Sequence, residues 1–233
     1  MCEAQLDSHS NSTADSNQKL LPWCYNMVVY GDGAFSSYTC SCTVVLCPNN
    51  HETKYQKQGT GNGDKSRSLA VIPDNIDKLE GVKYFILTYV AVESIPSSLW
   101  QMKGVRLFMM NGIEHSKKFH LPRRLGFDEI SLLYLTYSNI TGSIPSQWGE
   151  DLKDTEIQSL ALSGNNITGT LPPVWSKLKY IKDISFNSNP SLSGTIPSEW
   201  KSMEDLVLIF LGGTNITTKG SPFPESKMHG GVN

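Results

Sequence analysis

Apolar and polar positions follow a fixed order over residues 157–171, IQSLALSGNNITGTL. Ile157, Leu160 and Leu162 precede Asn165 and then Ile167, which gives the order apolar-x-x-apolar-x-apolar-x-x-Asn-x-apolar. The alternation around Leu160 predicts a short strand that buries every second residue, and the residues after it predict a turn and a return segment. One such unit cannot bury its own apolar edge, so similar units are expected on both sides.

The same unit recurs along the chain. Its marker is an apolar residue followed by proline, with another apolar residue three positions after the proline, as in IPDNI, IPSSL, LPRRL, IPSQW, LPPVW and IPSEW. The prolines stand at 73, 96, 122, 145, 172 and 197, so the steps are 23, 26, 23, 27 and 25 residues. Steps of this size are typical of leucine-rich repeats and are shorter than those of ankyrin or tetratricopeptide repeats.

We therefore expect an α/β-type solenoid of about six leucine-rich repeats. It should be a right-handed superhelix with a parallel concave sheet, few short helices and a Cys-rich cap at its N-terminal end. The strictest test of this arrangement is that Trp148, Trp175 and Trp200 lie in successive coils of the core.

Within each copy the strand should alternate between the core and the concave face. The inward pairs are expected to be Phe85 and Leu87, Phe108 and Met110, Leu133 and Leu135, Leu160 and Leu162, Ile184 and Phe186, and Ile209 and Leu211. The first two copies diverge from the others, and a slip of one residue there would exchange the two faces.

On this register, an aromatic and aliphatic patch occupies the N-terminal half of the concave face. Its members are Tyr84, Ile86, Leu107, Met109, Leu132, Tyr134 and Tyr137. Apolar side chains exposed together usually mark an interface, and tyrosine is frequent in binding hot spots. The patch is therefore the candidate ligand-binding site; the alternative is that the Cys-rich segment covers it.

Composition limits the possible functions. The 233-residue chain has a formal net charge of −2, which argues against a protein held to nucleic acid by phosphate contacts. We expect a disordered N-terminus over 1–20, a Cys-rich cap and Gly-rich loop over 21–70, the repeats over 71–220 and a tail over 221–233. The longest apolar run, 206–211, is too short to span a bilayer, and residues 1–20 lack an apolar signal segment. Attachment to a membrane would need an anchor that these residues do not supply.

All five cysteines lie in the first 47 residues, and four of them cluster. The pattern favours a disulfide-bonded cap made by Cys24, Cys40, Cys42 and Cys47. A zinc site formed by Cys40, Cys42, Cys47 and His51 is the alternative, although its C-x-C-x4-C-x3-H spacing departs from the usual knuckle. Reduced thiols are a further alternative, and the partner of Cys2 is undetermined.

Two other segments suggest ligands. Gly59 to Ser66, GTGNGDKS, nearly matches a phosphate-binding loop, but Asp64 replaces the last glycine and no strand precedes it, so nucleotide binding is a distant alternative. The basic run 114–126 contains Lys117, Lys118, Arg123 and Arg124, which would form either an anion or glycan site or a solvated loop. No catalytic constellation is present, so we expect neither an enzyme nor a cofactor.

Glycosylation acceptors favour an extracellular setting. Asn139, Asn166 and Asn215 each begin an Asn-Ile-Thr sequon at the same position of a copy, and Asn11 begins a fourth. Together with the clustered cysteines they indicate a secreted or cell-surface protein, with a cytoplasmic location as the alternative.

The unit N-x-I-T-G-x-(I/L)-P-x-x-W resembles the plant-type leucine-rich repeat of receptor-kinase ectodomains and polygalacturonase inhibitors. LPPVWSKL and IPSEWKSM are even more similar to the repeats of trypanosomatid surface antigens. The resemblance implies a membrane-anchored or shed surface protein that recognises a protein ligand or host receptor through its repeats, with a glycan as the alternative ligand. A secreted inhibitor of a glycosidase is the alternative that it leaves open.

Overall fold

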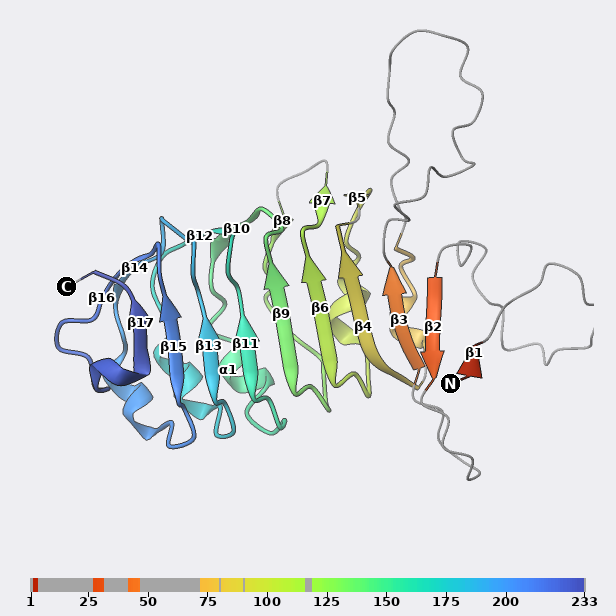
Figure 1. Cartoon of the computed structure of the whole chain (residues 1–233). Coiled ribbons are helices and arrows are strands. Elements are labelled where there is room, and N and C mark those ends of the chain that lie inside the picture. The colour runs from red at the N-terminus through yellow and green to blue at the C-terminus, as the bar shows by residue number, and fades with distance from the viewer. Residues whose placement is uncertain are drawn as a thin grey trace, which may run out of the picture.

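The computed structural model describes residues 72–79, 81–89, 91–115 and 119–232, together with the backbone of three N-terminal strands at 2–3, 27–31 and 42–46. Successive coils stand side by side in chain order, with short helical turns behind a long sheet (Figure 1).

The main sheet has ten strands. From β3 onward all neighbours are parallel, whereas β1 and β2 continue the sheet in antiparallel fashion beyond β3. In spatial order the strands are β1 (Cys2–Glu3), β2 (Met27–Gly31), β3 (Cys42–Leu46), β4 (Val82–Thr88), β6 (Leu107–Asn111), β9 (Leu132–Thr136), β11 (Ser159–Ala161), β13 (Asp183–Ser185), β15 (Leu208–Leu211) and β17 (Met228–Gly230).

Shorter elements close each coil. Two-residue to four-residue strands follow the main strands and pair with one another: β5 (Ala91–Val92), β7 (Glu114–His115), β8 (Phe119–His120), β10 (Ile140–Ser143), β12 (Asn166–Thr168), β14 (Ser193–Thr195) and β16 (Asn215–Thr217). The return segments hold 3₁₀ turns and one short α-helix: η2 (Ile76–Lys78), η3 (Ser97–Gln101), α1 (Trp148–Asp151), η4 (Pro173–Lys177), η5 (Ser198–Ser202) and η6 (Glu225–Lys227). Proline lies at or near the start of most of these turns, where its missing N–H costs no hydrogen bond.

The predicted register is confirmed in every copy. All six inward pairs are buried, and Phe85, Phe108 and Leu133 lie opposite one another on β4, β6 and β9. The divergent first two copies therefore keep the same faces as the others, because a slip would have exposed Phe85 and Phe108.

The tryptophan column is also confirmed. The Trp148 and Trp175 rings stack with centroids 6.1 Å apart, and those of Trp175 and Trp200 with centroids 6.3 Å apart. Each indole N–H donates to the proline carbonyl of the preceding coil: Trp148 to Pro122 at 2.8 Å, and Trp200 to Pro172 at 2.9 Å. The Pro-x-x-Trp motif thus joins neighbouring coils as well as filling the core.

Buried asparagines complete the turns that follow β11 and β13. The Asn165 side-chain oxygen accepts from the backbone N–H groups of Ser138 and Ile140, both at 3.1 Å. Its amide nitrogen donates to the carbonyls of Leu135 and Leu162, both at 2.8 Å. Asn189 repeats this pattern one coil later. Each side chain therefore satisfies backbone groups of two coils at once.

The two sides of the coil differ in register. In the main sheet equivalent residues pair directly, as Leu160 does with Ile184. In the β10–β12 pair, Ser143 lies opposite Thr168, although the repeat makes Thr141 the equivalent of Thr168. The β14–β16 pair is displaced in the same way. At these pairs the second side is therefore staggered by two residues per coil, whereas the β5–β7 pair keeps the offset of the main sheet.

The segment expected as a tail adds a further strand. β17 pairs in parallel with β15, and the His229 ring stacks on Phe210 with centroids 5.3 Å apart. Lys227 donates to the Leu206 carbonyl at 2.5 Å. These contacts place residues 225–230 against the last full coil.

We predict that Asn165→Ala lowers the free energy of unfolding by about 3 kcal/mol, because it leaves several buried backbone groups without a partner. Asn166→Ala is the matched control: its side chain is exposed, so a change of at most about 0.5 kcal/mol is expected. Urea denaturation of unglycosylated protein measures both. Equal losses in the two variants would contradict the role given to the buried amide.

Candidate functional site

The predicted patch forms two straight rows across three strands. Tyr84, Leu107 and Leu132 make one row, and Ile86, Met109 and Tyr134 make the other. All six side chains are half-buried on the outward face of the main sheet. The next strand, β11, continues the rows with the smaller Ser159 and Ala161, so the apolar patch ends there.

Tyr137, the seventh predicted member, lies beyond the end of β9 rather than within it. Its side chain is 62% exposed and its backbone is left-handed, with φ of 50°. The ring packs over Gly164 of the next coil, where an added Cβ would come within 2.2 Å of it. A glycine at 164 is therefore required to let the tyrosine lie flat.

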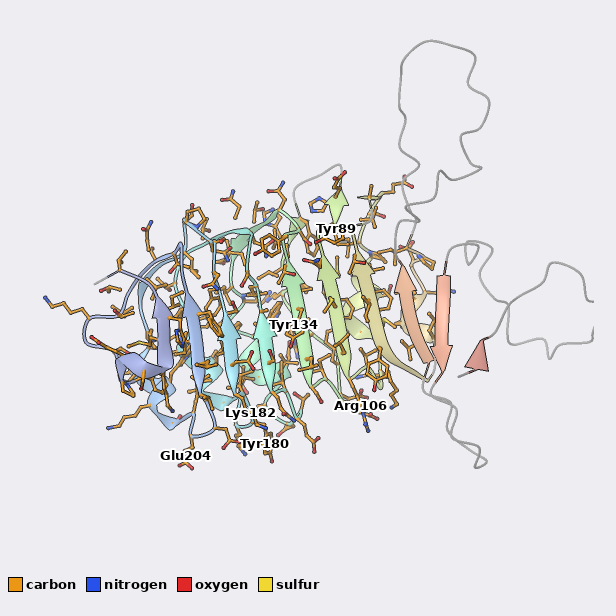
Figure 2. The ribbon with its side chains drawn as sticks, in the orientation of Figure 1. Tyr89, Arg106, Tyr134, Tyr180, Lys182 and Glu204 are labelled. Carbon is orange, nitrogen blue, oxygen red and sulfur yellow. The ribbon has the colours of Figure 1, made fainter. Side chains whose placement is uncertain are left out.

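Tyr89 has the same arrangement two copies earlier, at the end of β4. The sequence-based prediction of the patch did not include it. It is 69% exposed, has φ of 52°, and packs over Gly112. The signal was present, since Thr88-Tyr89 and Thr136-Tyr137 occupy the same position of their copies. Figure 2 shows Tyr89 at the upper end of the strands, with Tyr134 on the sheet face below it.

Tyr89 and Tyr137 occupy a repeat position whose left-handed backbone favours glycine. The position after each strand has positive φ in six successive coils, occupied by Tyr89, Gly112, Tyr137, Gly164, Ser188 and Gly213. Most L-residues pay about 1–2 kcal/mol for this conformation. Strained backbone of this kind concentrates at functional sites, and here it presents two aromatic rings beside the apolar patch.

Charged side chains border the opposite end of the strands, where Figure 2 shows Arg106 and Lys182. Glu129 lies between two cations: Lys83 Nζ is 2.9 Å and Arg106 Nε 3.4 Å from its carboxylate. The hydrogen bond from Lys83 is the main cause that lowers the pKa of Glu129 below its ordinary value. Glu129 therefore remains ionised at neutral pH and offsets part of the charge of these two cations.

The two strands that follow the patch, β11 and β13, have a different character, whereas β15 again places Leu208 and Phe210 on this face. Ser159 donates to Asp183 at 2.5 Å, and Ser163 and Ser185 share a hydrogen bond of 2.6 Å. These small polar side chains bond to one another across neighbouring strands, so they offer a partner less apolar surface than β4, β6 and β9 do.

Several predicted sites lie outside the described residues. These are Asn11, the side chains of Cys24, Cys40, Cys42 and Cys47, His51, the Gly59 to Ser66 loop, Lys117 and Lys118. Within the described ranges, no three His, Cys, Asp or Glu side chains gather in a way that would hold a metal ion. No helix in those ranges is long and apolar enough to cross a membrane.

The three sequons of the repeats are exposed at Asn139, Asn166 and Asn215. Asn215 uses its side-chain amide to bond the Pro190 carbonyl at 2.7 Å. All three lie in or beside the short strands β10, β12 and β16, away from the main sheet. The two apolar rows on β4, β6 and β9 belong to the main sheet, whereas Asn139 follows the exposed Tyr137 by two residues.

Comparison with known proteins agrees with this geometry. The leucine-rich-repeat family model matches residues 156–178. A plant ice-binding protein of known structure is 20% identical over 70% of this chain and 52% of its own, with a TM-score of 0.55. The structure of a TDR receptor is 22% identical over 63% of this chain and 29% of its own, with a TM-score of 0.51. No curated protein sequence matches the chain.

The chain folds as a leucine-rich-repeat solenoid. It spans about half the length of the ice-binding protein and less than a third of the receptor. At these identities the likeness concerns the fold alone. The plant-type repeat expected from the sequence agrees with it.

We predict that Tyr137→Gly leaves the stability of the leucine-rich-repeat solenoid within about 1 kcal/mol of wild type. Relief of the left-handed strain offsets the lost ring packing and the added freedom of the unfolded chain. Tyr134→Gly, in the extended strand β9, should cost about 1–2 kcal/mol because no strain is relieved there. Thermal and urea unfolding compare the two variants. A loss above about 2 kcal/mol in Tyr137→Gly would show that the tyrosine is structural.

Proposed function

We propose that this leucine-rich-repeat solenoid is a recognition protein that binds a protein ligand on the outward face of its main sheet. The observation that carries the proposal is the contiguous patch on β4, β6 and β9 together with the strained, exposed Tyr89 and Tyr137. Aromatic residues are enriched where protein interfaces concentrate their binding energy.

The mechanism is rigid display. Every strand of the patch pairs with two neighbours, and the inward residues of the same strands are buried. The patch is therefore ordered before a ligand arrives, and little conformational entropy opposes binding. We infer no catalytic role, because the face presents apolar side chains and mutually bonded polar ones.

An extracellular or cell-surface setting completes the proposal, as in the trypanosomatid surface antigens that the repeats resemble. The exposed sequons at Asn139, Asn166 and Asn215 support it. Their position away from the main sheet is compatible with a glycosylated protein whose binding face stays open.

Site-specific crosslinking tests the proposal directly. A photoreactive amino acid at Met109, in the centre of the patch, should capture a protein partner on intact cells or in extracellular fluid. The same amino acid at Lys201, exposed on η5 behind the sheet, should not capture that protein. Capture from both positions, or from Lys201 alone, would contradict the assignment of the face.

For the partner so identified, we predict that Tyr134→Ala and Tyr137→Ala each weaken binding at least tenfold, which is about 1.4 kcal/mol. Ser185→Ala, on the same face but on the polar strand β13, should change affinity less than twofold. Surface plasmon resonance measures the three variants, with thermal unfolding as a check on folding. Wild-type affinity in both tyrosine variants would place the interface elsewhere. A captured glycosidase inhibited at a one-to-one ratio would establish the inhibitor alternative.

A further inference from the structure

A second candidate site lies away from the main sheet, on the side formed by β8 and β10. A depression of about 500 Å³ opens between these strands and the turn that follows β10. His120, Arg123, Thr141, Ser143 and Ser146 contribute its polar lining. Its size falls within the range of small-molecule sites.

The lining is basic and rich in hydroxyl groups, and it contains no carboxylate. The neighbouring carboxylate of Asp151 is already neutralised, because Arg124 Nε donates to it at 2.9 Å and the Leu125 N–H donates at 2.9 Å. Among the described residues no acidic side chain pairs with Arg123, which is exposed at the rim. Of the two adjacent arginines, Arg124 therefore pairs with Asp151, and Arg123 is available to an anion.

His120 is seated by a close contact that only glycine permits. Gly142 has φ of +89°, and an added Cβ there would lie 2.8 Å from His120 Nδ1. With its proton on Nδ1, the ring donates to the Thr141 carbonyl at 3.2 Å and leaves Nε2 as an acceptor for a ligand hydroxyl. In later coils the residues that pack on the equivalent glycines are the smaller Ser143 and Thr170. The histidine wall of the depression is thus particular to this coil, compared with the coils of Gly169 and Gly194.

We infer that this depression binds a sugar unit that carries a sulfate or phosphate ester. A tetrahedral oxyanion accepts hydrogen bonds from several directions, which suits a guanidinium and hydroxyl donors that come from different segments. The volume exceeds what a bare anion fills. The hydroxyl groups of Thr141, Ser143 and Ser146 can exchange hydrogen bonds with those of a sugar ring. Leu121 and Ile144 provide apolar surface on which the ring can pack.

This site is independent of the ligand proposed for the main sheet. It lies on the second side of the coil, and Thr141, part of its lining, also completes the sequon of Asn139. Binding is therefore measured on the full chain without N-glycans, so that no attached sugar competes for the depression.

Calorimetry or NMR titration at about 0.15 M salt, where weak long-range attraction is screened, tests the inference. The probes are N-acetylglucosamine 6-sulfate, N-acetylglucosamine 6-phosphate and neutral N-acetylglucosamine. At least one ester should bind ten times more tightly than the neutral sugar, and the two esters distinguish sulfate from phosphate as the source. Equal affinity for the neutral sugar, or no binding of either ester, would overturn the inference.

Arg123→Gln should weaken ester binding at least tenfold, and Ser143→Ala should weaken it by a smaller factor. Arg106→Gln, which removes the same charge at the border of the main sheet, should leave affinity within twofold. Wild-type affinity in Arg123→Gln would overturn the assignment. An equal loss in both arginine variants would also overturn it, because it would show attraction by net charge alone. Arg123 is exposed, and Arg106 is lost only from a surface ion pair with Glu129 that Lys83 also contacts, so thermal unfolding should change little in either variant.

Discussion

The solenoid depends on how it satisfies the backbone at the turn that follows each strand. The backbone N–H and C=O groups buried there form hydrogen bonds neither with the sheet nor with water. Asn165 and Asn189 bond these groups in their own coil and in the preceding one. A coil is therefore incomplete without its neighbour, which makes folding of the array cooperative. Ser138 and Thr214 take the same place in other coils, each with a hydroxyl that makes fewer bonds.

The tryptophan column couples the same coils on the other side of the core. A phenylalanine would fill less of the core and has no N–H to bond the proline carbonyl of the preceding coil. Stacking of Trp148, Trp175 and Trp200 adds about 0.5–1.5 kcal/mol per pair beyond the buried area. Asparagine and tryptophan together fix both the spacing and the order of the coils.

Much of the fold was predictable because the repeat imposes the same environment at each position. The period, the inward pairs and the tryptophan column follow from spacing alone, and the polar column after each strand follows from Asn165. The repeat also located the two rows of the apolar patch. It did not reveal the left-handed backbone at Tyr89, because tyrosine gives no sequence signal for positive φ as glycine does.

Contacts between unlike segments were not predictable. Arg123 and Arg124 are equivalent in a basic run, and only the fold brings Asp151, 27 residues after Arg124, against one of them. The same holds for His120 and Gly142, whose packing depends on the stagger of β8 and β10. Residues outside the repeat pattern take their roles from neighbours distant in the sequence, and periodicity carries no information about those.

The two-residue stagger of the short strands has a geometric consequence. Equivalent side chains of the main sheet line up across the coils, whereas in the β10–β12 and β14–β16 pairs each is displaced along the strand by about 6–7 Å from its predecessor. Sugars attached at Asn139 and Asn166 would therefore lie on a diagonal across the coils. They would cover a wider band of this side of the solenoid than sugars in a straight row.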